Sequence, residues 1–385
     1  MTLLVDAFVL GSTVLALVLA PRLLVQPAVR VRPAARRSMS PFGALAVVTG
    51  LFYVNQVLFT VYVLRVHRGD PSFIARYLPT GWFELATGQP ALRWIAAAFP
   101  GAPELLAPSV LRVQAFLELP FVLLAFATVL RWLDVELYRR IARSALLPLA
   151  SVSYTVVFCL VEWDLRNPYT VDDLVVRGVS AVLTPCFLAW LAARDGGASR
   201  RTPGSVPGLL VFIGSLGALG ALVLVVYDTA LLYNLGRLGE RLPIVVAAGG
   251  ALVGLRWVAS RLREATVPGP TLAFAWHALR YWLALFFLPA LAVRYGVMFG
   301  TPQLAAASGL LLILAALVLA WRGAAVVAWR LGVAVLAAAA VAGVVGWATP
   351  APYYEVTLLL AMTAFLVTGV VVGGLVDARV TASGP

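Results

Sequence analysis

Ionisable and amide side chains interrupt several apolar segments of this chain. An ionisable group inside such a segment is a functional candidate, because leaving it in hydrocarbon costs at least about 2.5–3.5 kcal/mol. One segment carries Gln114 and Glu118 at i, i+4, a spacing that places both on one helical face. The preceding apolar segment carries Asn55 and Gln56. We expect Asn55 and Glu118 to meet at similar depth, because each lies a similar distance from the predicted outer end of its helix.

These residue types indicate acid/base chemistry on an anionic substrate. A carboxylate shielded from water can act as a general acid or base, and arginine binds phosphate or carboxylate groups in bidentate fashion. The alternative is that the acids and arginines pair with each other at helix ends and only hold the bundle together. The predicted catalytic residues are Glu118, Asn55, Gln56, Glu162 and Asp164, and the predicted substrate-binding residues are Arg112, Arg166, Asp172, Asp173, His277, Arg280 and Tyr281.

Three of these candidates form a separate group toward the predicted inner side. His277, Arg280 and Tyr281 follow the i, i+3, i+4 spacing that places side chains on one helical face. This pattern predicts a proton relay or an anion site. An arginine whose side chain extends to the inner head groups beside a hydrogen-bonded histidine explains it as well.

The sequence predicts neither a metal nor a cofactor. The chain has two histidines, His67 and His277, and we expect them on opposite sides of the membrane. Its two cysteines, Cys159 and Cys186, are predicted at different depths in their helices. No P-loop, no dinucleotide-binding fingerprint and no GxSxG motif occurs.

The composition sets the class of protein that must position these residues. Of 385 residues, 62% are hydrophobic and 12% are charged, and the mean hydropathy is +0.95. A soluble domain is about 45–50% apolar and about 25% charged, so the soluble, disordered and fibrous classes are excluded. The formal net charge is +12, and every basic residue is arginine. In a membrane protein these arginines orient helices and contact lipid head groups, so nucleic-acid binding is not expected.

The apolar runs predict an all-α, polytopic helix bundle. A bilayer core needs about 20 mostly apolar residues for each crossing helix. Most arginines fall in loops that lie inside if the N-terminus is outside, so we predict N-terminus out and C-terminus in. About 11 spans are expected, within a range of 10–12, at 3–20, 43–64, 110–130, 145–163, 174–193, 208–227, 243–259, 271–293, 304–321, 331–348 and 356–376.

Two longer connections organise the chain. Turn signals and amphipathic stretches at 65–109 predict a segment lying in the membrane interface on the outer side. The Gly-, Ser- and Arg-rich stretch 194–207 reads as a cytoplasmic linker. It separates a polar-lined half at 1–193 from an apolar half at 208–385. GxxxG spacings at Gly250–Gly254 and Gly369–Gly373 predict close helix packing.

Three functional hypotheses remain open at this point. The first is an integral membrane enzyme that acts on a hydrophobic or lipid-linked substrate at the extracytoplasmic side, by metal-free acid/base or group-transfer chemistry. The second is a secondary transporter or exporter of a small molecule, and the third is a non-catalytic subunit of a larger membrane assembly. The expected partners are membrane lipid and a hydrophobic small molecule, and the sequence identifies no protein partner. The Arg-rich, Lys-free composition favours the plasma membrane of a prokaryote.

Overall fold

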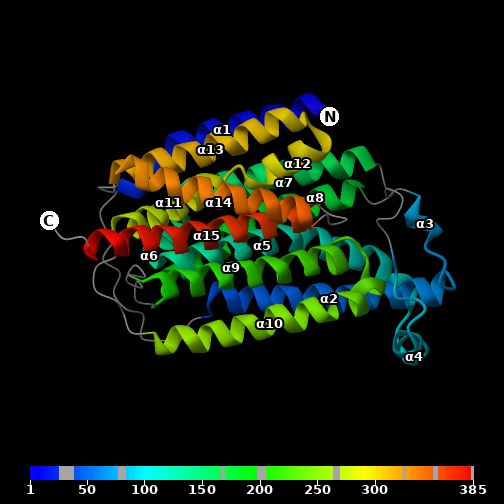
Figure 1. Ribbon diagram of the computed structural model, residues 1–385. Coiled ribbons are helices and arrows are strands. Elements are labelled where there is room, and N and C mark those ends of the chain that lie inside the picture. The colour runs from blue at the N-terminus through cyan, green and yellow to red at the C-terminus, as the bar shows by residue number, and fades with distance from the viewer. Residues whose placement is uncertain are drawn as a thin grey trace. The chain divides into compact units, whose positions relative to one another are not determined.

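The predicted all-α architecture is confirmed. The computed structural model describes residues 1–25, 39–76, 84–165, 170–196, 205–262, 269–323, 327–349 and 354–382. Almost all of these residues are helical, and no strand occurs in these ranges. The result is a bundle of long apolar helices (Figure 1).

The helices of the N-terminal part lie at α1 (Thr2–Val25), α2 (Pro41–Val66), α3 (Ser72–Ala75), α4 (Pro90–Ala98), α5 (Leu106–Leu133), α6 (Val135–Ala142), α7 (Leu146–Leu165) and α8 (Thr170–Arg194). The later helices lie at α9 (Val206–Val226), α10 (Leu238–Arg261), α11 (Pro270–Phe286), α12 (Ala290–Phe299), α13 (Pro302–Gly323), α14 (Ala328–Ala348) and α15 (Tyr354–Ala382).

The length and apolar composition of the described helices are those of a polytopic membrane protein. Nine of them are long and apolar enough to cross a membrane, and the number reaches eleven if each of two bent helix pairs forms one span. Most extend a few residues beyond the predicted spans, because hydropathy detects the hydrocarbon-embedded part of a helix and not its ends. The orientation, with the N-terminus outside, stays a prediction.

The predicted span 271–293 is wrong as a single helix. It breaks into α11 and α12, which are bent by 68°. Pro289 lies in the break, and proline interrupts a helix because it lacks the backbone N–H and its ring clashes with the preceding turn. The carbonyl of Phe287, freed at this break, accepts a hydrogen bond from the fully buried Tyr154 hydroxyl at 2.5 Å.

The predicted span 145–163 corresponds to α7, which follows the short helix α6 at a bend of 69°. The sequence predicts a loop where α6 lies. The carboxylate of Asp134 caps this helix by accepting from the backbone N–H groups of Glu136 and Leu137 at 2.9 and 3.1 Å. Such a cap stabilises a helix start by roughly 1 kcal/mol. The charged residues that follow lowered the local hydropathy, so no helix was predicted there.

The chain forms two compact units. The first consists of Met1–Ala198, Val226–Arg241 and Ala284–Leu312. Within it α2 packs against α5, α5 against α8, and α8 against α7. Phe52 of α2 and Phe121 of α5 meet edge to face, with ring centroids 5.5 Å apart. These three contacts bring most of the predicted site residues into one unit.

The second unit consists of Ser199–Val225, Leu242–Leu283 and Ile313–Pro385, and in it α14 packs against α15. The units are interleaved in sequence. The predicted division into 1–193 and 208–385 assumed continuous halves and stays a prediction.

The two predicted glycine motifs differ in their surroundings. A methyl group added at Gly369 would contact Ala338 at 3.7 Å, and one at Gly373 would contact Thr271 at 3.0 Å. Both glycines therefore lie at helix contacts, as GxxxG spacing predicts. Near Gly250 and Gly254 no atom of the described residues lies within 4 Å of such a methyl group. The packing role predicted for that second motif is wrong here.

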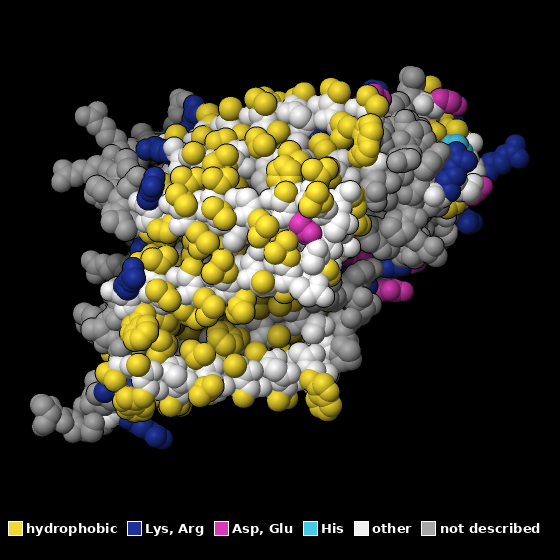
Figure 2. Space-filling view, turned by 90° about the horizontal axis from the view of Figure 1, so that it is seen from above, with side chains coloured by type: hydrophobic (Ala, Val, Ile, Leu, Met, Phe, Trp, Pro, Cys, Tyr) yellow, Lys and Arg dark blue, Asp and Glu magenta, His cyan; other side chains and the backbone are white. Residues whose placement is uncertain are grey.

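Hydrophobic side chains cover much of the surface in Figure 2, and few charged groups interrupt them. Leu336, for example, is 73% exposed and Val253 is also 73% exposed. Apolar surface on this scale is not tolerated in water, whereas lipid tails cover it without penalty. The surface therefore supports a protein surrounded by lipid.

The outer segment 65–109 is only partly helical. It contains α3, α4 and a 3-10 turn, and residues 77–83 lie outside the described parts. Residues 84–89 are not helical, and α4 is the longest helix described in this segment. Trp94 on α4 is 72% exposed, as expected for an aromatic ring at head-group level.

Candidate functional site

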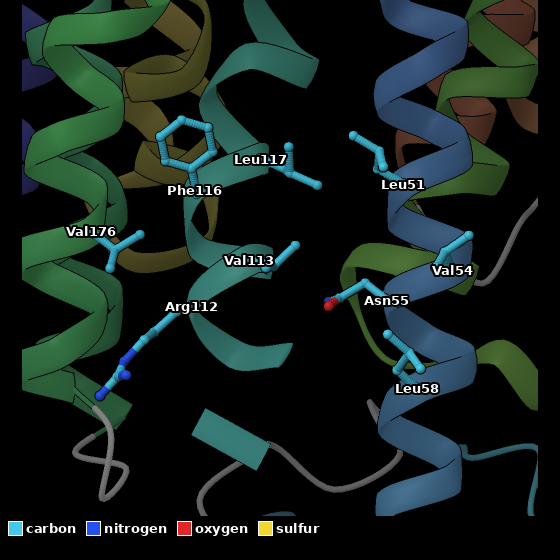
Figure 3. A pocket seen from close by; sticks show the side chains of 9 residues that line it. All are labelled: Leu51, Val54, Asn55, Leu58, Arg112, Val113, Phe116, Leu117 and Val176. Atoms are coloured by element: carbon cyan, nitrogen blue, oxygen red, sulfur yellow. The ribbon is translucent and has the colours of Figure 1, made fainter. Parts of the chain in front are cut away.

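A groove runs along the surface of the first unit between α2 and α5, with one contribution from α8 (Figure 3). Its volume is about 500 Å³. It is lined by Leu51, Val54, Asn55, Leu58, Arg112, Val113, Phe116, Leu117 and Val176.

The helical periodicity of the sequence builds both walls of this groove. On α2 the spacing of Leu51, Asn55 and Leu58 follows i, i+4, i+7, and on α5 the spacing of Val113 and Leu117 follows i, i+4. Leu51 is 46% exposed and Val113 is 42% exposed, so the groove opens to the surroundings. Both helices are candidate spans.

Polar side chains enter the groove at two places. Asn55 points across it toward α5, and Arg112 points from the opposite side of α5 toward the start of α8 (Figure 3). The remaining lining residues are apolar. The groove therefore has apolar walls with one amide group and, at one end, a guanidinium group.

A buried amide network fixes Asn55 in this position. Its Nδ2 donates to the carbonyl of Val110 at 3.0 Å and to Oε1 of Gln114 at 3.4 Å. Gln56 Nε2 donates to the same Oε1 at 3.4 Å. All three amide side chains are at most 4% exposed. These bonds join α2 to α5, although Gln56 Oε1 is buried and has no hydrogen-bond partner among the described residues, so the network is only partly satisfied.

The network ends on a π-helical turn at Tyr227–Leu231. Gln114 Nε2 donates to the carbonyls of Ala230 and Leu231 at 3.3 and 3.2 Å. The Tyr53 hydroxyl pairs with the Thr229 hydroxyl at 2.8 Å. π-helical turns are rare and are often found at functional sites.

Asp228, within this turn, lies among positive groups. Arg241 Nε donates to its Oδ2 at 2.9 Å, and Arg237 Nη1 lies 3.9 Å from its Oδ1. Arg237 also donates to Glu84 at 2.9 Å, and the N–H of Gly236 donates to the Glu84 carbonyl at 3.0 Å. The π-helical turn is therefore tied to the outer segment.

The carboxylate of Glu118 forms a buried ion pair. Arg177 Nη1 of α8 lies 2.5 Å from Glu118 Oε2, and the two side chains are only 5% and 13% exposed. The Arg177 guanidinium also stacks over the ring of Phe158, 5.1 Å from its centroid. Glu118 does not line the groove, whereas its neighbour Leu117 does. Asn55 bonds to Gln114 and Glu118 pairs with Arg177, and the predicted meeting of Asn55 and Glu118 stays a prediction.

A second ion pair lies at the end of the groove next to the start of α8. Arg112 Nη2 is 2.6 Å from Asp172 Oδ2, and both side chains are 48% exposed. Asp172 and Asp173 occupy the first turn of α8, where carboxylates interact favourably with the helix dipole. Asp173 is 6% exposed. Arg112 and Asp172, both predicted to bind substrate, are thus close together. Of the two aspartates, Asp172 is the accessible one.

Three predicted residues lie outside the part that can be described. Arg166 belongs to residues 166–169, which are outside the described ranges, and the side chains of Glu162 and Asp164 are outside them as well. Their predicted roles stay predictions.

His277, Arg280 and Tyr281 lie on α11 in the second unit. The rings of His277 and Tyr281 stack with centroids 6.2 Å apart, so the predicted shared face is present. Tyr281 packs beside Phe274 and Ala320. This packing supports a structural role for Tyr281, and the relay or anion site stays a prediction.

Sequence reasoning missed two elements of the site. Arg177 was not predicted as the partner of Glu118, because hydropathy does not show which sides of two helices pack against each other. The π-helical turn left no recognised signal in the sequence. Gln114 was noticed, but its central place in the amide network was not predicted.

Within the described ranges, no group of three histidine, cysteine or acidic side chains could hold a metal ion. Comparison of the chain with protein-family models, with curated proteins and with solved structures finds no match in any of the three. Function is therefore inferred from the geometry and chemistry of the site.

Proposed function

We propose that this chain is an integral membrane enzyme that acts on a lipid or lipid-linked substrate at the predicted extracytoplasmic side of a prokaryotic plasma membrane. The observation that carries the proposal is the groove between α2 and α5. It is apolar along its length, opens toward lipid and has a charged pair at its outer end. Such a groove matches an amphiphile with an apolar tail and an anionic head group.

Different residues of the groove would contact the tail and the head group of the substrate. Leu51, Val54 and Val113 would contact the tail, since all three are exposed on the groove walls. Arg112 would bind a phosphate or carboxylate of the head group in bidentate fashion. The head group would displace the half-exposed pairing of Arg112 with Asp172, which contributes little stability because solvent screens it.

The accessible carboxylate beside the bound head group is Asp172, and we assign it the acid/base role in group transfer. As a base, it would accept the proton of the attacking hydroxyl or water as its oxygen bonds to the transferred group. The bond from that group to the leaving oxygen would break, and Asp172 would return the proton to the leaving oxygen. Glu118 lies away from the groove and is held by Arg177. Its proposed role is therefore to position α5 against α8. This places the catalytic proposal on Asp172, in place of the original candidate Glu118.

The test is mass spectrometry of cell and medium extracts from a deletion strain complemented with variants. We expect a precursor of altered mass to accumulate in the deletion strain and in the strain carrying Asp172→Asn. Complementation with Arg93→Gln should restore the wild-type profile, because Arg93 is an exposed arginine that does not line the groove. An unchanged profile in the Asp172→Asn strain would overturn the assignment.

Transport is the second candidate, and two observations favour it. The described residues include two bent helix pairs, and discontinuous helices form the substrate sites of many secondary transporters. It also buries the amide network and the Glu118–Arg177 pair within candidate spans. In the same experiment, a chemically finished compound retained inside the deletion strain would mean transport. Identical profiles with and without the gene would favour a non-catalytic subunit.

A further inference from the structure

The amide network determines whether the groove offers a hydrogen-bond donor or an acceptor, and this restricts the class of lipid that the groove can bind. The carbonyls of Ala230 and Leu231 can only accept hydrogen bonds, so the Gln114 group that faces them must be its NH₂ group. The opposite assignment would place three oxygens against one another. Gln114 Oε1 consequently faces α2.

The orientation of Gln114 fixes that of Asn55. Two acceptors, Gln114 Oε1 and the Val110 carbonyl, face the Asn55 amide, so both must receive its Nδ2 hydrogens. Both hydrogens of Asn55 are thus used inside the protein. Exchanging its oxygen and nitrogen would lose both hydrogen bonds.

The remaining polar atom of Asn55 is Oδ1, which faces the groove (Figure 3). Asn55 is only 4% exposed, and within the described residues no hydrogen-bond donor to this oxygen is present. A polar atom that loses water without gaining a partner is costly. A ligand in the groove is therefore bound best if it brings a donor to this point.

We infer that the groove selects an anionic lipid that carries a hydroxyl or amide N–H donor next to its head group. This inference rests on the proposed function. Asn55 Nδ2 bonds to Val110, two residues before Arg112 on α5, so the amide and the start of the Arg112 side chain lie within about one helical turn along α5, while the guanidinium extends toward α8 (Figure 3). Sphingoid-type phosphates have this arrangement, because their amide N–H and hydroxyl stand next to the phosphate. Diacyl phosphates have ester oxygens there and offer no donor.

The test compares two lipids with the same phosphate head and matched chains, dihydroceramide 1-phosphate and phosphatidic acid. Binding to the purified full chain is measured in detergent by native mass spectrometry. We expect dihydroceramide 1-phosphate to bind about five- to tenfold more tightly, the effect of one satisfied hydrogen bond. Arg112→Gln should weaken both lipids, whereas Arg93→Gln should weaken neither.

Two variants test the role of the network itself. Asn55→Leu removes the acceptor, so the affinity ratio of the two lipids should fall to about one. Gln114→Met releases one Asn55 hydrogen, which can then turn to the groove, and it should also reduce the ratio. The second variant keeps the test available if the first does not fold.

The failures of the two proposals are distinguishable. If the wild-type protein binds both lipids equally in an Arg112-dependent way, the lipid groove stands and the donor requirement is overturned. If neither lipid binds, or if Arg112→Gln changes nothing, the lipid groove itself is overturned.

Discussion

Replacing Glu118 with glutamine leaves the guanidinium of Arg177 buried without this carboxylate partner. Glu118 stands eight residues beyond Val110, where its candidate span begins, or about 12 Å along the helix at 1.5 Å per residue. The two side chains are 13% and 5% exposed, so water screens the pair only weakly. Removing one member of a buried ion pair costs about 3–5 kcal/mol. We therefore expect Glu118→Gln to lower the free energy of unfolding by roughly 3 kcal/mol or more.

Removing both charges should cost less than removing one. The double variant Glu118→Leu, Arg177→Met removes both charges of this pair, and such replacements are often neutral or stabilising. We expect the double variant to be clearly more stable than Glu118→Gln alone. This order identifies the cost as that of removing one charge of a buried pair and separates it from lost packing.

The assay is reversible unfolding in mixed detergent and SDS micelles, followed by circular dichroism. Asp172→Asn is the matched control, because it breaks a pair whose side chains are both 48% exposed and should cost less than about 1 kcal/mol. If Glu118→Gln costs no more than Asp172→Asn, the Glu118–Arg177 pair does not hold α5 against α8 and our account of it is refuted.

Two further predictions concern capping contacts. A methyl group added at Gly269 would clash with Oδ2 of Asp377, which accepts hydrogen bonds from the first residues of α11. Gly269→Ala should therefore lower the thermal midpoint in detergent by an amount equivalent to about 1–3 kcal/mol. An unchanged midpoint would contradict this. The backbone N–H and then the hydroxyl of Ser72 hold the pKa of Asp70 below its usual range. The local stabilisation should be complete above the unfolded-state pKa of about 3.9 and disappear as pH falls through the lower folded-state pKa. Hydrogen exchange of the Ser72 amide, corrected for its intrinsic rate, should therefore accelerate in that acidic range and not at neutral pH.

The spans were predictable because one physical requirement governs them. A segment that crosses a bilayer must keep about 20 residues apolar, and this requirement is visible in one sequence. The break between α11 and α12 was not predicted, although Pro289 marks it. Hydropathy averages over a proline, whereas the missing N–H acts on one hydrogen bond.

The site was predictable in residue type and not in pairing. Asn55 and Gln114 stand out because amides are costly in an apolar segment, and both are buried in the amide network. The partner of Glu118 depends on which face α5 turns to α8, and neither helix carries this information alone. The same limit applies to the groove, which arises from the spacing between α2 and α5.

The most direct test of the lipid-binding account is photo-crosslinking of the full chain in nanodiscs that contain a phosphatidic acid with a photoactivatable acyl chain. We predict labelling concentrated on the groove-facing residues of α2 and α5, such as Leu51, Val54 and Val113. This labelling should fall several-fold in Arg112→Gln and remain unchanged in Arg93→Gln. Labelling spread evenly over the exposed spans, or labelling of the groove that Arg112→Gln leaves intact, would contradict the account.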